Sequence, residues 1–294
     1  NAAIATIGSS TGIAGGVAPG NATITYTIGT GCIMTAVLTV NPLPATIGGT
    51  LTVCAGQTTP LSDATAGGTW SSGSTGVATV VAGTGLVTGV AAGNATITYT
   101  ISTGCIITAV VTVNPLPSAI TGTLAVCVNS NTTLSSSSGG GTWGSSNAAI
   151  ATIGSGTGTA GGVSAGTVTM TYTLGTGCIA STPFTVNPLP AAITGTMNVC
   201  VNSNTTLSDA TTGGTWSSSD NAIATVDGSG TVSGVATGTV TITYTDSNGC
   251  QTTASVVVNA LPTITGTLSA CVNATTLLSG SGSPAVSNPW VSSS

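Results

Sequence analysis

The chain has 294 residues and contains no Lys, Arg, His or Glu, and its only charged side chains are five aspartates. An ordinary globular domain is about a quarter charged, whereas this chain is 2% charged. Nucleic-acid binding lacks the cations that neutralise phosphate, and catalysis lacks the usual general acids and bases, so we expect neither nucleic-acid binding nor enzymatic activity. We also expect no cofactor.

A disordered chain or a membrane-spanning helix is likewise unexpected. Disorder goes with low hydrophobicity and high net charge, but 40% of these residues are hydrophobic and the net charge is only −5. No run of 18 apolar residues occurs, so the sequence predicts no transmembrane helix and no membrane insertion. The chain should fold as an ordered protein outside the bilayer.

Internal repeats define the predicted organisation. Asn-Pro-Leu-Pro occurs three times and Asn-Ala-Leu-Pro once, with steps of 73, 73 and 72 residues, at 41–44, 114–117, 187–190 and 259–262. We interpret these segments as short, semi-rigid linkers, because proline favours an extended backbone. In chain order they separate the C-terminal half of a repeat (1–40), three whole repeats (45–113, 118–186 and 191–258) and the N-terminal half of another (263–294).

Within each repeat, apolar and polar residues alternate with a period of two. The alternation is clear in 94–100, 107–113 and 239–245, and Gly-rich turn signals separate such segments. This pattern predicts β-strands. We expect about seven short strands and no helix in each repeat, which makes an all-β chain of small β-sandwiches in series, forming a rod or fibre.

The residues of one repeat resemble a known family. They read G-T-W-S-S at 68–72, V-A-T-V at 77–80, G-L-V-T-G-V-A-A-G at 85–93 and A-T-I-T-Y at 95–99. This series is similar to the bacterial immunoglobulin-like (group 2) domain. The resemblance implies a seven-stranded Ig-like sandwich that serves as a spacer or presenter in surface proteins such as invasin- and intimin-like adhesins. The added cysteines and the V-N-P-L-P joint resemble repeats of large secreted surface proteins of Bacteroidota.

The eight cysteines form an early and a late series, and almost no other metal ligand accompanies them. We therefore expect disulfides in an oxidising, extracellular environment. Two pairings are open. The favoured one lies within repeats: Cys54–Cys105, Cys127–Cys178 and Cys200–Cys250. The other crosses each linker: Cys32–Cys54, Cys105–Cys127, Cys178–Cys200 and Cys250–Cys271.

The within-repeat pairing leaves Cys32 and Cys271 as candidates for a bond between units. The two half-repeats are complementary, so Ser294 followed by Asn1 of another copy would complete a further domain. Either the polypeptide continues, or separate subunits share that domain by strand complementation. We expect copies to associate end to end in both cases, with Cys271 bonded to Cys32 of the next copy.

Other residue patterns have structural interpretations. We expect the tryptophans, Trp70, Trp143, Trp216 and Trp290, to be core residues of the third strand rather than sugar-stacking platforms. Rows of outward threonines are expected to be solvated strand faces rather than an ice- or carbohydrate-binding surface. Calcium binding by Asp220, Asp227 and Asp246 is not favoured, because no calcium-loop motif is present. Possible glycosylation acceptors are Asn21, Asn94, Asn131, Asn204 and Asn273.

The favoured function is that of a rigid, disulfide-braced structural segment of an extracellular bacterial filament or giant cell-surface adhesin. With so little charge repulsion, such a segment could also pack laterally. Two alternatives remain open. One is an adhesive module with a glycan ligand, and the other is a subunit of a surface layer or sheath.

Overall fold

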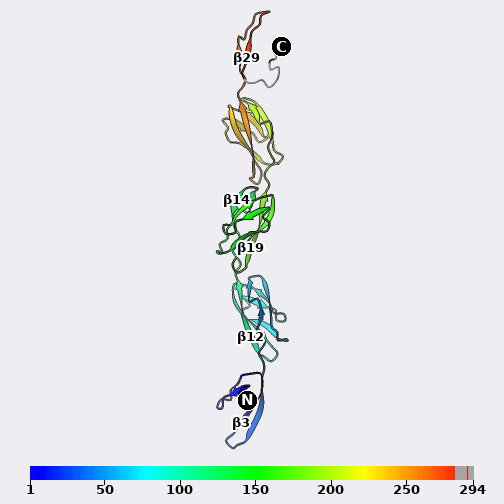
Figure 1. Cartoon of the computed structure of the whole chain (residues 1–294), viewed down its shortest axis with the longest axis vertical. Coiled ribbons are helices and arrows are strands. Elements are labelled where there is room, and N and C mark those ends of the chain that lie inside the picture. The colour runs from blue at the N-terminus through cyan, green and yellow to red at the C-terminus, as the bar shows by residue number, and fades with distance from the viewer. Residues whose placement is uncertain (282–289, 291–294) are drawn as a thin grey trace. The chain divides into compact units, whose positions relative to one another are not determined.

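The computed structural model describes residues 1–281 and Trp290, and the described chain consists of strands and loops without a helix (Figure 1). It divides into two compact units, and residues 118–186 contribute to both. Of the predicted half-repeat at 263–294, residues 282–289 and 291–294 lie outside the described residues. The all-β prediction is confirmed.

The repeat at 45–113 is a sandwich of two four-stranded sheets. The first sheet has the order β5 (Gly48–Gly49), β7 (Thr58–Ser62), β10 (Leu86–Gly89), β9 (Ala78–Val80). The second has the order β6 (Thr52–Cys54), β12 (Ile106–Asn114), β11 (Gly93–Thr100), β8 (Thr69–Ser72). The first of the seven predicted strands is divided between the sheets, because β5 pairs antiparallel with β7 while β6 pairs parallel with β12.

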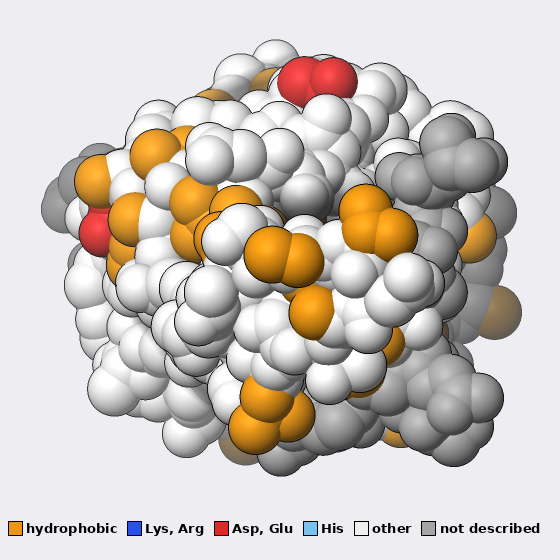
Figure 2. Space-filling view, turned by 90° about the horizontal axis from the view of Figure 1, so that it is seen from above, with side chains coloured by type: hydrophobic (Ala, Val, Ile, Leu, Met, Phe, Trp, Pro, Cys, Tyr) orange, Lys and Arg blue, Asp and Glu red, His pale blue; other side chains and the backbone are white. Residues whose placement is uncertain are grey.

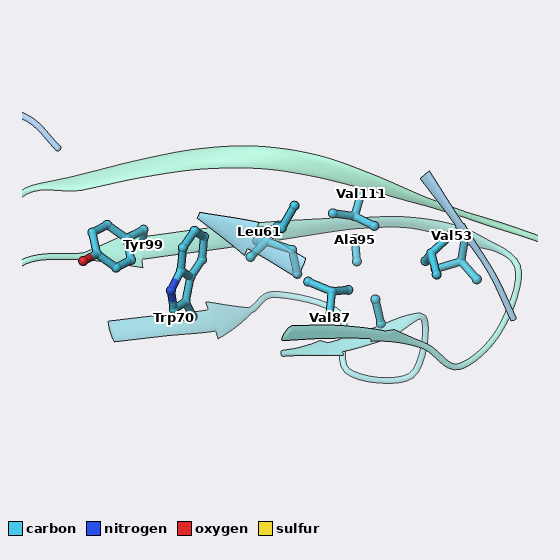
Figure 3. Packing of buried hydrophobic residues seen from close by; sticks show 10 residues of the cluster. Val53, Leu61, Trp70, Val87, Ala95, Tyr99 and Val111 are labelled. Atoms are coloured by element: carbon cyan, nitrogen blue, oxygen red, sulfur yellow. The ribbon is translucent and has the colours of Figure 1, made fainter. Parts of the chain in front are cut away.

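Strand alternation builds the core of this repeat. In β11, Ala95, Ile97 and Tyr99 are buried, and the threonines between them lie on the other face. Figure 3 shows Ala95 beside Val111 from β12 and Val87 from β10, and Tyr99 beside Trp70, all within one buried cluster. β-branched and aromatic residues favour such half-buried pleated surfaces, so local preference and burial agree.

The other two complete repeats use the same arrangement. Residues 118–186 form the sheets β13-β19-β18-β15 and β14-β17-β16, and an isolated bridge between Thr121 and Ser135 stands where β5 and β7 pair. Residues 191–258 form the sheets β20-β22-β25-β24 and β21-β27-β26-β23. The bounds are β13 (Ala125–Cys127), β14 (Asn131–Thr133), β15 (Thr142–Ser145), β16 (Ala151–Ile153), β17 (Thr159–Gly162), β18 (Gly166–Thr173), β19 (Ile179–Asn187), β20 (Thr194–Gly195), β21 (Asn198–Cys200), β22 (Asn204–Ser208), β23 (Thr215–Ser218), β24 (Ala224–Val226), β25 (Thr231–Gly234), β26 (Gly238–Thr245) and β27 (Gln251–Asn259).

One pair of core positions differs in size among the repeats. Val87 and Val111 in the first complete repeat correspond to Val232 and Val256 in the third. In the middle repeat the same positions hold Ala160 and Phe184, both of which are fully buried. A smaller residue on one sheet thus accompanies a larger one on the other, which keeps the core volume similar, as close packing requires.

The half-repeats form two-stranded sheets only. Residues 1–40 contain the pairs β1 (Ala5–Ile7) with β2 (Ala14–Gly16) and β3 (Gly20–Thr27) with β4 (Ile33–Val40). Residues 263–281 contain the pair β28 (Ile264–Gly266) with β29 (Leu278–Gly280). Ala5 and Ala22 are buried like their counterparts in the complete repeats, but Tyr26, the counterpart of buried Tyr99, is 72% exposed.

Candidate functional site

Two disulfides connect consecutive repeats. Cys54 is bonded to Cys178 with a Cα–Cα distance of 5.7 Å, and Cys127 is bonded to Cys250 with a distance of 5.6 Å. Each bond joins the early cysteine of one repeat to the late cysteine of the next. Both predicted pairing schemes, within a repeat and between nearest cysteines across a linker, are therefore wrong for these four residues.

The strand register explains why a bond within a repeat does not form. Cys54 ends β6 in register with Asn114, the last residue of β12, whereas Cys105 comes directly before β12 begins. The nine residues of β12 separate the two cysteines by about 30 Å at the usual strand rise. A disulfide needs Cα atoms within about 7 Å, so the early and late cysteines of one repeat are out of reach.

The cross-linker scheme fails for a related reason. Cys127 lies in register with Asn187 at the end of β19, which is the end of its repeat away from linker 114–117. Cys178 comes directly before β19 and is therefore at the end where this linker enters. The late cysteine, not the early one, is thus the residue placed to meet the preceding repeat.

The early cysteine is held by the same backbone bonds in all three complete repeats. The residue after it donates its N–H to the linker asparagine carbonyl, as Ala55 does to Asn114 at 3.0 Å. The next residue donates to a glycine carbonyl, as Asn129 does to Gly162 at 2.9 Å. Asn129 has φ 64°, and Gly56 stands at the equivalent position with φ 79°, since this turn needs a residue that tolerates a left-handed backbone.

Four cysteines carry no disulfide among the described residues. Cys32 and Cys105 are late cysteines, and Cys200 and Cys271 are early ones. Cys32 and Cys271 are exposed, while Cys105 and Cys200 are half-buried. The Sγ of Cys105 lies 4.0 Å from the carbonyl oxygen of Asn41 in the preceding linker, so this late cysteine also faces the joint before its repeat.

The tryptophans pack against the tyrosines of the sixth strand. The Trp70 and Tyr99 rings have centroids 4.7 Å apart, and the pairs Trp143–Tyr172 and Trp216–Tyr244 are similar. Trp70 is buried, and Trp143 and Trp216 are half-buried. Trp290 is 49% exposed in its half-repeat, and its core position in a completed domain stays a prediction.

Each of these tyrosine hydroxyls closes a loop. The Tyr99 hydroxyl donates to the Thr65 carbonyl at 2.6 Å and accepts the Gly68 N–H at 2.9 Å. Thr65 is itself positioned by Asp63, whose carboxylate accepts its N–H at 2.7 Å, and the Thr65 hydroxyl accepts the N–H of Ala45 after the linker. A Cβ on Gly68 would lie 2.4 Å from Tyr99 Cζ, so only glycine fits against this ring.

We predict that Tyr99→Phe lowers the free energy of unfolding by about 1–3 kcal/mol, because it leaves two part-buried backbone groups without partners. Tyr26→Phe is the matched control, since Tyr26 occupies the equivalent strand position but is exposed. Denaturant unfolding followed by tryptophan fluorescence measures both. Equal effects of the two substitutions would show that the hydroxyl bonds contribute nothing.

The aspartates do not form a metal site. No group of three or more potential ligands that could hold a metal ion occurs in residues 1–281 and Trp290. Asp220, Asp227 and Asp246 instead accept backbone N–H groups of their own loops, from Ala222, Ser229 and Asn248 respectively. The pKa of Asp227 lies below its ordinary value of 3.8, chiefly because the Ser229 hydroxyl and then the Thr231 N–H bind the charged carboxylate.

Because the pKa of Asp227 is lowered in the folded state, the stability of the fold should decrease at low pH. A carboxyl group with a lower pKa in the folded state stabilises the fold above its unfolded pKa, and the contribution is lost as the pH falls through the folded value. We expect Tm to be nearly constant between about pH 5 and 7 and to fall only below about pH 4. Thermal melts from pH 2 to 7 should show a weaker acid decline in Asp227→Asn than in the unaltered protein, and an identical decline would contradict this assignment.

The surface of the described chain carries few charges and both polar and apolar side chains. Figure 2 shows mainly uncharged atoms with scattered hydrophobic side chains and a few aspartates on the face in view. The five predicted glycosylation acceptors are all exposed, and Asn273 lies in a turn with φ 66°. Within residues 1–281, no helix has the length and hydropathy needed to cross a bilayer.

Comparisons with known proteins identify the family. The bacterial Ig-like domain (group 2) family matches residues 33–105 and 180–257. No curated protein sequence matches the chain. Domains 1–6 of the surface-layer protein SbsC are 16% identical with a TM-score of 0.25, and the match covers 93% of this chain and 51% of that one. The chain thus spans about half the length of that surface-layer fragment.

Two further solved structures are similar. Invasin, a bacterial integrin-binding protein, is 17% identical with a TM-score of 0.35, and the match covers 86% of this chain and 67% of invasin. A fragment of intimin in complex with the intimin-binding domain of its translocated receptor has the same identity and TM-score, with 53% of this chain and 67% of that one covered. Since the two family matches together include more than half of the residues, the chain belongs to the bacterial Ig-like domain (group 2) family.

Proposed function

We propose that the chain is a structural segment of an extracellular bacterial filament or large cell-surface adhesin, in which cystine-linked Ig-like repeats hold a binding tip away from the cell. The observation that carries this proposal is the pair of disulfides, Cys54–Cys178 and Cys127–Cys250, each of which ties one repeat to the next. Disulfides persist in oxidising compartments outside the cytosol, which supports an extracellular location.

The use of the aromatic side chains supports a structural rather than a ligand-binding role. In the three complete repeats the tryptophans pack on tyrosines, whose hydroxyls are engaged by backbone groups. These rings are therefore not presented as platforms for sugars. The distinctive feature of the chain is the joint between consecutive repeats. A short proline-containing linker and a disulfide both restrict the movement of one repeat on the next there.

End-to-end association of copies is part of the proposal. Tyr26 is exposed in residues 1–40, whereas its counterpart Tyr99 is buried, and the exposed Ile7, Ile28 and Met34 correspond to residues that pack partly buried against the core of the complete repeat. The cysteine pair and the V-N-P-L-P joint are the basis for a proposed likeness to secreted surface proteins of Bacteroidota. Lateral packing of copies is proposed on the low surface charge alone.

Small-angle scattering tests the bracing role. The comparison is between a variant that lacks Cys32, Cys105, Cys200 and Cys271, with both disulfides intact, and the same variant with all eight cysteines replaced by serine. We expect a broader distribution of interatomic distances once the two disulfides are lost, because only the linker then restricts the movement of one repeat on the next. Indistinguishable distributions would mean that the disulfides do not brace the repeats, and the stalk function would be wrong.

A further inference from the structure

The half-repeat at 1–40 contains a hollow at the position where a complete repeat has β6, the strand that ends in the early cysteine. The hollow measures about 430 Å³ and is lined by Gly16, Val17, Ala18, Pro19, Val40, Asn41 and Leu43. Gly16 corresponds to Gly89, and Val40 and Asn41 correspond to Val113 and Asn114. In the complete repeat these counterparts adjoin β6, the strand that ends in the early cysteine.

The glycine environments identify what the hollow lacks. A Cβ on Gly89 would meet Val113 Cγ1 at 2.9 Å, the Cys54 carbonyl at 2.8 Å and Val53 Cγ1 at 3.2 Å. Gly162 and Gly234 likewise face an early-cysteine carbonyl, that of Cys127 or Cys200. The three atoms nearest to a Cβ on Gly16 all belong to Val40, at 2.8 to 3.7 Å, so the valine is in place and no cysteine carbonyl lies as close as in the complete repeats.

A segment equivalent to β6 lies near the other end of the chain and pairs with no described strand. Residues 268–271 correspond to 51–54, and Leu268, Cys271 and Val272 are exposed. The turn that follows already has the geometry of complete repeats. Ala274 donates to the Cys271 carbonyl at 2.9 Å, as Gln57 does to Cys54 at 3.0 Å, and Asn273 has a left-handed φ like Asn129 and Asn202.

The unpaired cysteines agree with this docking. With 268–271 in the hollow, Cys271 would lie in register with Asn41, as Cys54 does with Asn114. Cys105 already has its Sγ 4.0 Å from the Asn41 carbonyl, so it would face Cys271. Cys200 lies in register with Asn259 at the end of its own repeat, and the next late cysteine along the joined repeats is Cys32.

We propose that the 268–273 segment of a second copy of this sequence docks as the strand missing from residues 1–40, and that each junction is closed by two disulfides, Cys271–Cys105 and Cys200–Cys32. The proposal deepens and rests on the end-to-end association given above. It replaces the expected Cys271–Cys32 bond with a different pairing, because every disulfide in the described chain joins an early cysteine to the late cysteine of the following repeat.

The chemistry of each bond is ordinary thiol–disulfide exchange with a small disulfide such as oxidised glutathione. One cysteine thiolate attacks that disulfide and releases one glutathione thiol. The second cysteine thiolate then attacks the mixed disulfide and releases the other. Two protein thiols lose two electrons and two protons, and one glutathione disulfide becomes two glutathione thiols.

Paired double substitutions test the assignment in the full chain, refolded in a glutathione buffer and run on denaturing gels without reductant. The unaltered chain should give a ladder of multimers that reductant collapses to one band. C32S/C200S and C105S/C271S each leave one complete bond and should keep the ladder. C105S/C200S and C32S/C271S leave two non-partners, so both should lose it. Cross-linked peptides released by thermolysin identify the bonds by mass.

The outcomes separate the pairing from the broader proposals. A ladder that persists in C105S/C200S would overturn this pairing and leave end-to-end association standing. A single-chain band of altered mobility would show that 268–273 docks within its own chain, which overturns the proposal, as would the absence of any ladder. A polypeptide in which two copies are fused could also form both bonds internally. That result would support the proposed pairing, with the 268–273 strand supplied by the same continuing chain. Scattering by the eight-serine variant tests the stalk function independently.

Discussion

Replacing Cys54 and Cys178 by serine is expected to lower the free energy of unfolding by about 3–5 kcal/mol. The bond closes a loop with a sequence separation of 124 residues, and its loss restores the conformational entropy of that loop to the unfolded chain. Denaturant unfolding of the oxidised protein, monitored by fluorescence, measures the change. With both proteins isolated as single chains, Cys32→Ser is the matched control, because Cys32 is exposed and carries no bond in the described chain.

The same substitution should also change cooperativity. The Cys54–Cys178 bond joins two repeats that have separate sheets, so an oxidised pair should resist separate unfolding. Without the bond, we expect the repeats to unfold in distinguishable steps with a lower apparent m-value. A single transition at an unchanged midpoint would contradict both expectations and would assign the stability to the linker and the cores.

Phe184→Val is expected to lower the free energy of unfolding by about 2–3 kcal/mol. Phe184 is fully buried in β19 and is the largest such side chain among the described residues. The substitution creates a cavity, because the facing position holds Ala160 rather than the valine found in the other complete repeats. Thermal and denaturant unfolding measure the loss.

The matched variant is the double substitution A160V/F184V, which gives the middle repeat the residues of the other two. Ala160→Val alone should cost about 1–3 kcal/mol, because it overfills the core. Together the two changes should restore most of the stability, so their effects should be strongly non-additive. Simple addition of the two losses would show that these positions do not share one packing space.

The strands and the sandwich could be predicted from the sequence because the signals are local. Alternation in 94–100 places Ala95, Ile97 and Tyr99 on one face, and the structure buries all three. The division of the first strand into β5 and β6 was not predicted, because it depends on parallel pairing of β6 with β12. That pairing involves residues some sixty positions apart and leaves no periodic trace.

The disulfide pairing could not be predicted for a similar reason. Spacing along the chain places Cys54 near Cys105, but the partner of a cysteine is decided by the end of the repeat at which it lies. Cys54 lies at the end of its sandwich from which linker 114–117 leaves, and Cys178 lies at the end of the next sandwich that this linker enters. The repeats in the sequence show which eight positions are cysteines. The register of β6 on β12 is needed to tell at which end of a repeat each cysteine lies.

The overlap of the two disulfide loops changes what a stretching force can do. Besides the full backbone, a pull applied outside Cys54 and Cys250 has two shorter covalent routes, each made of one disulfide and the backbone of about one repeat. These shorter routes become taut first. A single cut anywhere in the backbone between these cysteines leaves the molecule in one piece. Because neither route follows the full backbone, the oxidised chain has a much shorter maximum reach than the reduced one. The redox state of the surroundings therefore sets how far this stretch of the polypeptide can be drawn out.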